Sequence, residues 1–188
     1  MSAITVSRQV GSRGDELAAL VAQRLGWRLV GRELINQAAR EAGVPEVALA
    51  EMDELRLLDI RPSTRDWRAY QLQVERIIRN LADEGRVVIV GRGSQIVLRE
   101  RPGVLHVRVV APLAQCLEWL QQERGLSREA AIAYLATSSR TRARYIRRSY
   151  HVDVNDPALY HLVVNTGLLA LEQAANVIIQ ALREIGGL

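Results

Sequence analysis

The chain has 188 residues, of which 48% are apolar and 24% are charged, a composition typical of a soluble globular protein rather than of a disordered or fibrous one. Its formal net charge is +4, and all 25 basic residues are arginine, because the sequence contains no lysine. The length predicts one domain over residues 1–188. No run approaches the roughly 20 apolar residues of a membrane span and no leader pattern opens the chain, so we expect a cytoplasmic protein without membrane contact. Nothing in the sequence indicates an oligomeric state.

The chain opens with a predicted strand, Ile4 to Ser7, followed by a turn with Gly11 and Gly14 and by a helical pattern that ends at Gly26. A glycine-containing turn between a buried strand and a helix points backbone N–H groups and the helix dipole at one place, where phosphate is the natural ligand. The usual phosphate-binding loop, G-x-x-x-x-G-K-[ST], supplies a lysine and a hydroxyl. Here the helix begins Gly14-Asp15-Glu16. Arginine and backbone amides must therefore replace the lysine if this loop binds nucleotide phosphates.

Further strand patterns alternate with helical ones along the rest of the chain. The strands are predicted at Arg28–Val30, Val87–Val90, Leu105–Val110 and Leu162–Asn165. Helical spacing connects Trp67 with Leu81 before Gly85, and Leu171 with Ile185 near the end of the chain. Strands that alternate with helices need crossover connections. The pattern therefore predicts a five-stranded parallel sheet covered on both faces, which is a three-layer α/β fold.

Two segments are longer than a crossover needs, residues 31–84 and residues 127–156. The first is mostly helical, with a break predicted near Ile60 to Ser63, where Pro62 disfavours helix. The second is dominated by arginine. Ligands bind at the carboxyl ends of the strands in an open α/β sheet, so long excursions from those ends are candidates for moving lids.

The second long segment contains an arginine cluster, formed by Arg140, Arg142, Arg144, Arg147 and Arg148. At 100° per residue, all of them except Arg142 occupy an arc of about 100° on one helix face. A guanidinium group can bind phosphate through two parallel hydrogen bonds. The stripe therefore indicates a phosphate site or an ordinary solvated face, with a nucleic-acid surface as a third reading. The small net charge does not require nucleic acid as a partner.

The third strand pattern ends in Gly91-Arg92-Gly93. Glycines at the carboxyl end of a strand allow a ligand to approach the backbone, and Arg92 would face the same crevice as the first loop. The alternative is a plain strand-to-helix turn with an exposed arginine.

The remaining candidate groups are expected to be structural. Cys116 lies in an apolar helical pattern, which predicts a buried thiol. His106 and His161 belong to strand patterns, whereas His151 follows the arginine cluster and could contact a ligand. The histidine spacing suggests no metal ligand, and neither G-x-S-x-G nor H-E-x-x-H occurs.

Taken in order, these motifs resemble the cytidylate kinase-like family of P-loop nucleoside monophosphate kinases over nearly the full length of the chain. The matching segments are Ile4 to Gln9 with Gly11, Ser12, Gly14 and Glu16, then Gly31 to Ile35, Val88 to Gly93, Arg142 to Ile146, Tyr150, Asp156-Pro157 and Tyr160 to Thr166. Their order and spacing, more than any single motif, carry the resemblance.

The resemblance implies a P-loop NTPase fold with a helical monophosphate-binding insertion within residues 31–84 and an arginine-rich lid within residues 127–156. It implies ATP and Mg²⁺ as cofactors and nucleotides as partners, with no metal ligated by the protein. Acceptor phosphate would be bound by Arg32 and Arg92, and lid arginines would neutralise the transferred phosphate. Those lid residues are Arg140, Arg144 and Arg147. Donor phosphates would be bound at Ser7, Arg8, Gly11, Ser12, Arg13, Gly14 and Asp15.

The chain also departs from the authentic cytidylate kinases. Gly14 stands where they carry the loop lysine, and Val90 stands where they carry an acid beside Gly-Arg. Asp15 stands where many of the cytidylate kinase-like relatives have arginine, so it places a carboxylate where the triphosphate would approach. Gly31 replaces the aspartate that precedes Arg32 in the cytidylate kinase-like relatives. Two hypotheses follow, an ATP-dependent phosphotransferase that acts on a nucleoside monophosphate and a catalytically inactive nucleotide-binding relative that serves as a sensor or interaction protein. The acceptor base stays open in both.

Overall fold

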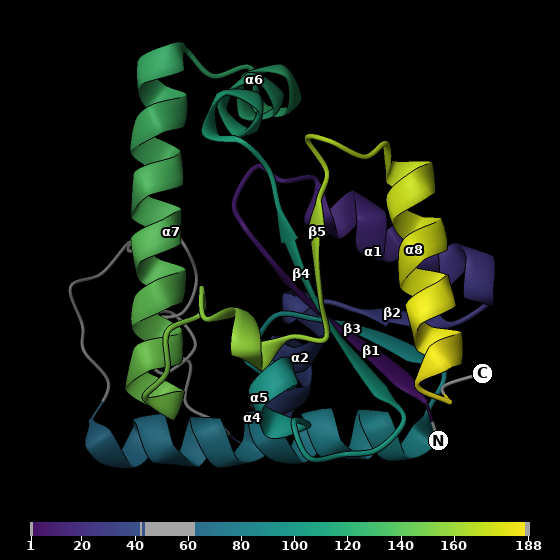
Figure 1. Ribbon diagram of the computed structural model, residues 1–188. Coiled ribbons are helices and arrows are strands. Elements are labelled where there is room, and N and C mark those ends of the chain that lie inside the picture. The colour runs from purple at the N-terminus through teal and green to yellow at the C-terminus, as the bar shows by residue number, and fades with distance from the viewer. Residues whose placement is uncertain (1, 42, 44–62, 187–188) are drawn as a thin grey trace.

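The computed structural model of the protein describes residues 2–41, 43 and 63–186 (Figure 1). The strands are β1 (Ala3–Arg8), β2 (Arg28–Val30), β3 (Val87–Val90), β4 (Val104–Val110) and β5 (Leu162–Asn165). The helices are α1 (Gly14–Leu25), α2 (Arg32–Glu41), α4 (Thr64–Glu84), α5 (Ser94–Val97), α6 (Leu113–Arg124), α7 (Arg128–Tyr150) and α8 (Leu171–Glu184), with a short 3₁₀ helix η1 (Pro157–Leu159). Among these helices, none combines the length and the apolar character of a membrane span.

The five described strands form one parallel sheet in the order β2-β3-β1-β4-β5. Strand β1 lies at its centre, where Thr5 is paired with Ile89 of β3 and with His106 of β4. This confirms the predicted α/β fold. Strand β1 is longer at both ends than predicted, because its ladder with β4 begins at Ala3 and continues to Arg8. The register brings the carboxyl ends of β1, β3 and β4 to the same edge.

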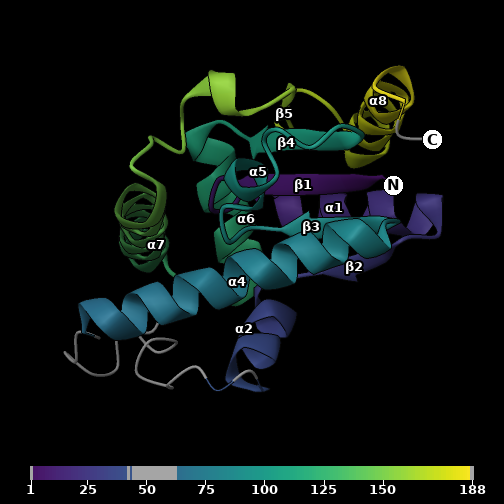
Figure 2. The ribbon, with the colours of Figure 1, turned by 90° about the horizontal axis from the view of Figure 1, so that it is seen from below.

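Apolar side chains form a core on each face of the sheet, as the predicted three layers require. On one face, α1 and α8 pack through side chains such as Leu17 and Ile178 against β1, β3, β4 and β5. On the other face, α2 and α4 pack through side chains such as Ile35 and Tyr70. The same arrangement is visible in Figure 2, where α4 crosses in front of β3.

Serine side chains fix the starts of the two long helices. Ser63 accepts a hydrogen bond from the Asp66 backbone N at 3.1 Å, and Ser127 accepts one from the Ala130 backbone N at 3.2 Å. Such N-caps stabilise a helix by about 1 kcal/mol. The predicted break near Ile60 to Ser63 falls outside the described residues except for Ser63. The arginine-rich segment forms the single 23-residue helix α7.

Helix α7 is docked on α4 at the carboxyl edge of the sheet, as Figure 1 shows. The Tyr145 ring meets the Trp67 ring edge-on, with centroids 5.9 Å apart. The side-chain amide of Gln71 donates a hydrogen bond to the Ser149 carbonyl at 2.8 Å. These contacts hold the second half of α7 over the carboxyl ends of the strands.

Of the groups expected to be structural, Cys116 and His106 are packed inside the fold, whereas His161 is exposed. Cys116 is a buried free thiol. His106 is buried, with its Nδ1 2.7 Å from the Thr5 hydroxyl, and its ring stacks on the His161 ring at 4.9 Å. Burial and the neighbouring His161 lower the pKa of His106 to about 4. His151 ends α7 in a left-handed conformation and is exposed.

Candidate functional site

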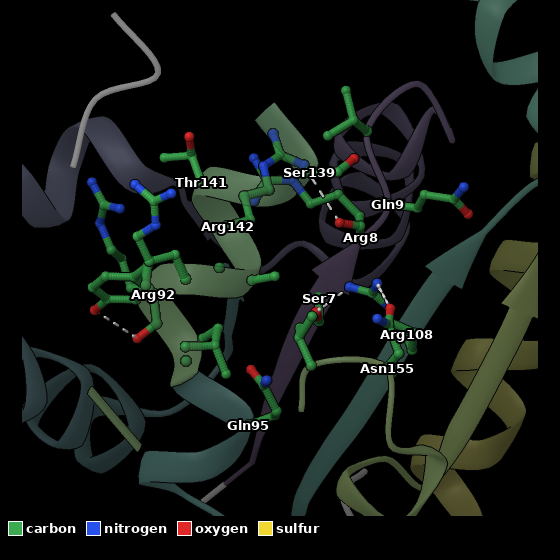
Figure 3. Close-up of a pocket in the computed structure, with 18 of the residues that line it drawn as sticks. Ser7, Arg8, Gln9, Arg92, Gln95, Arg108, Ser139, Thr141, Arg142 and Asn155 are labelled. Carbon is green, nitrogen blue, oxygen red and sulfur yellow. Dashed lines mark hydrogen bonds between the residues drawn. The ribbon is translucent and has the colours of Figure 1, made fainter. Parts of the chain in front are cut away.

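A cavity of about 350 Å³ lies between the carboxyl ends of β1, β3 and β4 and the second half of α7 (Figure 3). Seven arginines contribute to its wall: Arg8, Arg32, Arg92, Arg108, Arg142, Arg144 and Arg148. None of the described lining residues is Asp or Glu. Apolar side chains, among them Val10, Trp67 and Ile146, complete the wall. The cavity is therefore suited to an anionic ligand that also has an uncharged part.

The loop between β1 and α1 is held by hydroxyl groups that donate hydrogen bonds to its backbone carbonyls. The Ser12 hydroxyl donates to the Gln9 carbonyl at 2.8 Å, and the Thr166 hydroxyl donates to the Ser12 carbonyl at 2.7 Å. Gly11 has φ +73°, and a β-carbon there would lie 2.7 Å from the Cys116 carbonyl oxygen. The loop ends at Arg13, whose side chain does not cap α1. The N-terminal amides and positive dipole end of α1 are thus positioned for an anion.

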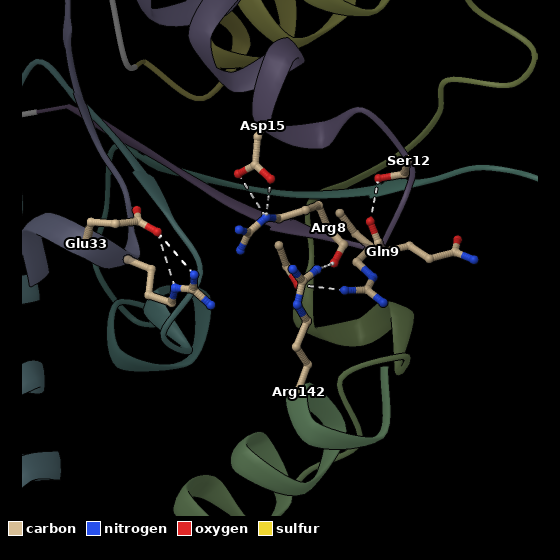
Figure 4. A network of polar contacts seen from close by, with 9 residues as sticks. Arg8, Gln9, Ser12, Asp15, Glu33 and Arg142 are labelled. Carbon is tan, nitrogen blue, oxygen red and sulfur yellow. Dashed lines mark hydrogen bonds and ion pairs between the residues drawn. The ribbon is translucent and has the colours of Figure 1, made fainter. Parts of the chain in front are cut away.

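Arg8 extends from the end of β1 across this loop (Figure 4). Its Nε lies 3.2 Å from one carboxylate oxygen of Asp15 and 3.1 Å from the other. Its carbonyl oxygen accepts a hydrogen bond from Arg142 Nη1 at 3.4 Å. Burial and the charge of Arg142 lower the pKa of Arg8, although Asp15 opposes this shift. The charge of Arg8 is largely buried and lies beside the charge of Arg142, so an anionic ligand would stabilise it.

Arg13, which was expected to bind donor phosphates, contacts two protein side chains instead. Its guanidinium forms an ion pair with Glu16, with Nη2 and Oε2 2.6 Å apart, and lies 5.6 Å from the centroid of the Trp119 ring. Arg13 is not among the residues that line the cavity. The charge near the loop comes instead from Arg8 and Arg142.

Arg92 is held by polar and aromatic neighbours without a carboxylate. Its Nη2 donates to Asn36 Oδ1 at 2.9 Å, and its guanidinium lies 5.5 Å from the centroid of the Tyr145 ring. The Tyr150 hydroxyl donates to the Arg92 carbonyl at 3.3 Å. Arg92 has φ +54°, and its neighbours Gly91 and Gly93 have φ +83° and +72°. This strained turn aims a fixed cation into the cavity, as the sequence pattern indicated.

Arg108 is a charged residue of the site that the sequence motifs did not predict. It projects from β4, and its residue is only 8% exposed. Its Nη1 donates to the Ser7 hydroxyl at 2.8 Å and its Nη2 donates to Asn155 Oδ1 at 3.1 Å, so both partners are neutral. Burial lowers its pKa. The sequence did contain a sign of this role, because Arg108 interrupts the apolar run Val104–Val110. Arginine is rarely buried in a strand unless it has a polar partner or a ligand.

Helix α7 contributes part of its arginine cluster to the cavity. Arg142, Arg144 and Arg148 line it, and Arg148 also lies 3.9 Å from the centroid of the Trp67 ring. Arg140 and Arg147 are exposed and lie outside the lining. The helix is rotated this way because Tyr145 and Ile146 pack inward. The face toward the cavity is thus different from the centre of the predicted stripe.

Arg32 lies at the start of α2, beside the end of β2. It lines the cavity and is paired with Glu33, with Nη2 and Oε1 3.2 Å apart. A second hollow of about 470 Å³ adjoins the cavity, and Arg8, Arg32 and Arg142 line both. A cluster of cations therefore stands where ligands in the two hollows would meet.

The cavity can stabilise negative charge and position it, but the described lining offers no carboxylate as a general base. Phosphoryl transfer fits these limits, because it depends mainly on positioning and on electrostatic stabilisation of the moving group. Among the described residues, no three His, Cys, Asp or Glu side chains gather to hold a metal. This still fits Mg²⁺ bound with a nucleotide, since that ion takes most of its ligands from phosphate and water.

The model of the cytidylate kinase-like family matches residues 3–168. A cytidylate kinase from Ignicoccus hospitalis is 27% identical over 179 residues, which cover 95% of this chain and 97% of that protein. One from Pyrococcus horikoshii is 30% identical over 180 residues, 92% and 86% of the two chains. A uronate isomerase from Corynebacterium glutamicum is 31% identical over 93 residues, but these span only 18% of that enzyme.

Solved structures show the same fold at low sequence identity. An uncharacterized protein from Eubacterium ventriosum has a TM-score of 0.78 and 17% identity, covering 97% of this chain and 99% of that one. Shikimate kinase from Acinetobacter baumannii has a TM-score of 0.57 and 12% identity, with 98% and 94% covered. The sheet and its helices are those of the P-loop kinases. Family and fold together indicate a nucleotide-binding, kinase-like protein. The family model spans the whole described sheet, and the chain therefore belongs to the cytidylate kinase-like family.

Proposed function

We propose that the protein is an ATP-dependent phosphotransferase whose acceptor is a nucleoside monophosphate. One observation carries the proposal: a cavity at the carboxyl edge of a P-loop kinase sheet has seven arginines and no carboxylate in its described lining. Two phosphorylated substrates brought together repel each other, and cations in the wall of the cavity offset that repulsion. The cytidylate kinases among the relatives make CMP the first acceptor to test.

The donor phosphates would bind at the loop from Gly11 to Asp15, where the first amides of α1 point toward the ligand. Mg²⁺ would accompany the triphosphate and help to neutralise the charge that develops during transfer. Asp15 is the acidic side chain at this loop, and its 68% exposed carboxylate could contact the ion directly or through water.

The acceptor phosphate would bind at Arg92 and Arg32. Arg92 is fixed by Asn36, so its guanidinium needs no reordering when the phosphate arrives. Trp67 lines the same cavity and offers an aromatic surface to the uncharged part of the acceptor. Lid arginines, above all Arg142 and Arg144, would stabilise the phosphoryl group during transfer.

The direct test is phosphoryl transfer from ATP and Mg²⁺ to CMP, dCMP, UMP, AMP, GMP and dTMP. We expect turnover with at least one of them, and a loss of about 100-fold or more in kcat/KM when Arg92→Gln removes the acceptor cation. Arg183→Gln, an exposed arginine of α8 outside the cavity, is the matched control and should leave kcat/KM unchanged. No turnover with any of these acceptors would reject the proposal.

A second candidate, a nucleotide-binding protein without catalysis, is favoured by one feature of the loop. Position 14 has no side chain, and the Asp15 carboxylate is bound to Arg8 where phosphate oxygens would have to compete for it. This candidate predicts saturable binding of a nucleotide without product formation. The same acceptor panel, combined with calorimetric titration of ATP, separates the two functions.

A further inference from the structure

The loop of this chain has exchanged the positions of a glycine and a cation. The usual form G-x-x-x-x-G-K-[ST] begins with glycine and has lysine as its seventh residue. When Gly14 is placed at the lysine, the first glycine falls on Arg8. The chain thus has a cation where the pattern has glycine and a glycine where the pattern has the cation.

The structure shows that the two exchanges depend on each other. A β-carbon built on Gly14 would lie 2.5 Å from Cβ and 3.0 Å from Cγ of Arg8, so the stem of Arg8 covers the space that a side chain at position 14 needs. A lysine at position 14 would therefore collide with Arg8 unless position 8 were small. The converse also holds, because Arg8 can take this path only over a glycine.

The end of the Arg8 side chain reaches the carboxyl edge of β3. Its Nη1 would lie 2.9 Å from a β-carbon built on Gly91, and Arg8 is one of the residues that line both hollows. The guanidinium thus lies between the phosphate-binding loop and the Gly91-Arg92 turn. In this place it faces the region where the donor's terminal phosphates would meet the acceptor.

The charges around Arg8 favour an anionic ligand. Its side chain is 16% exposed, whereas its partner Asp15 is 68% exposed, so solvent weakens the attraction within the pair. Arg142 and Arg32 both act to lower the pKa of Arg8. A group with several phosphate oxygens could bind all three guanidiniums and would remove this repulsion.

We propose that Arg8 replaces the missing loop lysine and binds the terminal phosphates of a triphosphate. The assignment rests on the proposed function for the identity of the donor, but it concerns binding and not turnover. It also explains why a glycine at position 14 is compatible with a working loop: the cation comes from the other end of the loop over the same space.

The test is calorimetric titration of ATP and of inorganic triphosphate, each with and without Mg²⁺, into five proteins. Four of them are the wild type, Arg8→Met, Gly14→Lys and the double variant Arg8→Gly with Gly14→Lys. Methionine keeps an apolar stem over Gly14 and removes only the charge. Arg28→Gln, an exposed arginine of β2 paired with Glu84 outside the cavity, is the matched control. Thermal unfolding of each variant without ligand shows whether it is folded.

We expect Arg8→Met to bind both ligands about 10- to 100-fold more weakly than the wild type, which is the effect of losing a charged hydrogen-bond donor to phosphate. Gly14→Lys should unfold at a lower temperature because of the collision with Arg8. The double variant relieves that collision and supplies a lysine, so its affinity should return to within about fivefold of the wild type. Arg28→Gln should bind like the wild type.

Three results would overturn the assignment: wild-type affinity in Arg8→Met, a folded double variant that binds no better than Arg8→Met, or no triphosphate binding by the wild type. The fate of the proposed function is read separately. Arg8-dependent binding without turnover on any acceptor would reject the kinase function and keep the assignment. Turnover by Arg8→Met with an unchanged KM for ATP would reject the assignment of Arg8 and keep the kinase function.

Discussion

Arg92 and Asn36 join the turn after β3 to helix α2. Both Nε and Nη2 of Arg92 donate to the same Asn36 oxygen, at 3.3 and 2.9 Å. Asn36 is buried, and its Oδ1 also accepts from the Tyr70 hydroxyl at 3.4 Å. A neutral amide oxygen orients the guanidinium without cancelling its charge. The guanidinium of Arg92 is therefore fixed in place, and its charge is still available to an anion.

Replacing this amide with a carboxylate should weaken acceptor binding without unfolding the protein. In Asn36→Asp, the new carboxylate would form an ion pair with Arg92 and compete with the acceptor phosphate. We expect KM for the acceptor to rise at least about tenfold, with kcat less affected and the melting temperature maintained or raised. Steady-state kinetics and thermal unfolding at pH 7.5 measure both quantities.

Asn36→Ala is the matched control for Asn36→Asp, because it removes the oxygen that orients Arg92 and adds no charge. It should raise KM less than Asn36→Asp and lower the melting temperature, because the buried Tyr70 hydroxyl loses a partner. An unchanged acceptor KM in Asn36→Asp would show that Arg92 does not bind the acceptor.

Arg108 should be a binding residue that contributes little to stability. Its buried charge has the neutral partners Ser7 and Asn155, so its desolvation is not repaid by an ion pair within hydrogen-bond reach. Arg108→Met removes the charge and keeps most of the volume. We expect the free energy of unfolding to change by less than about 1.5 kcal/mol, or to increase, while the affinity for phosphorylated ligands falls about tenfold or more.

Chemical denaturation without ligand and calorimetric titration of ATP and CMP test this prediction. The conservative variant Arg108→Lys keeps a charge but not the fork that contacts both partners, and it should recover only part of the affinity. A loss of stability above about 3 kcal/mol in Arg108→Met would show that the guanidinium is structural, since losses of that size come from broken buried networks.

The fold could be predicted from the sequence because its strands are short β-branched runs bounded by turn residues. Val87–Val90 is buried at every position and ends in Gly91, so its limits could be predicted from the letters alone. The ends of β1 were predicted less accurately. Ala3 and Arg8 join the sheet through their pairing with β4 and not through a strand propensity of their own.

The site was less predictable because the direction of a side chain depends on packing between distant segments. Helical periodicity grouped Arg140 and Arg147 with Arg144, but Tyr145 packs on Trp67 and turns another face of α7 toward the cavity. The path of Arg8 depends on the empty space above Gly14, a consequence of the folded loop that no single-residue pattern contains.

Gly93 should be required by its surroundings as well as by its backbone. It has φ +72°, and a β-carbon there would collide with the Tyr150 ring. Gly26, at φ +63°, has open space around the same position and is the matched control. We expect Gly26→Ala to cost about 1 kcal/mol of unfolding free energy, the price of a left-handed alanine, and Gly93→Ala about 2–4 kcal/mol.

Urea denaturation of the two variants gives both values under the same conditions. The difference between them isolates the collision with Tyr150, because the backbone conformations are alike. Equal losses in the two variants would mean that the Tyr150 ring moves aside freely, and its hydrogen bond to the Arg92 carbonyl would then contribute little to the position of that turn.

Stability should fall in mild acid because of His106. Its pKa in the folded protein is about 4, lowered from 6.5 chiefly by burial, so the unfolded chain binds a proton that the folded protein excludes. The stabilising contribution of the neutral imidazole is present above pH 6.5 and is lost as the pH falls from 6.5 toward 4, by an amount on the order of 1–3 kcal/mol. Urea denaturation at pH 7.5 and pH 4.5 measures the loss.

The variant His106→Gln separates this effect from the general titration of carboxylates. Glutamine can keep a polar contact to Thr5, whose hydroxyl lies 2.7 Å from Nδ1 in the native protein, but it cannot bind a proton in this range. The variant should therefore lose less unfolding free energy than the wild type between pH 7.5 and pH 4.5, even where its stability at pH 7.5 is lower. If both proteins lost the same amount, the folded His106 would have to accept a proton as readily as the unfolded chain does, and its ring could not be the neutral, buried neighbour of His161 that the structure shows.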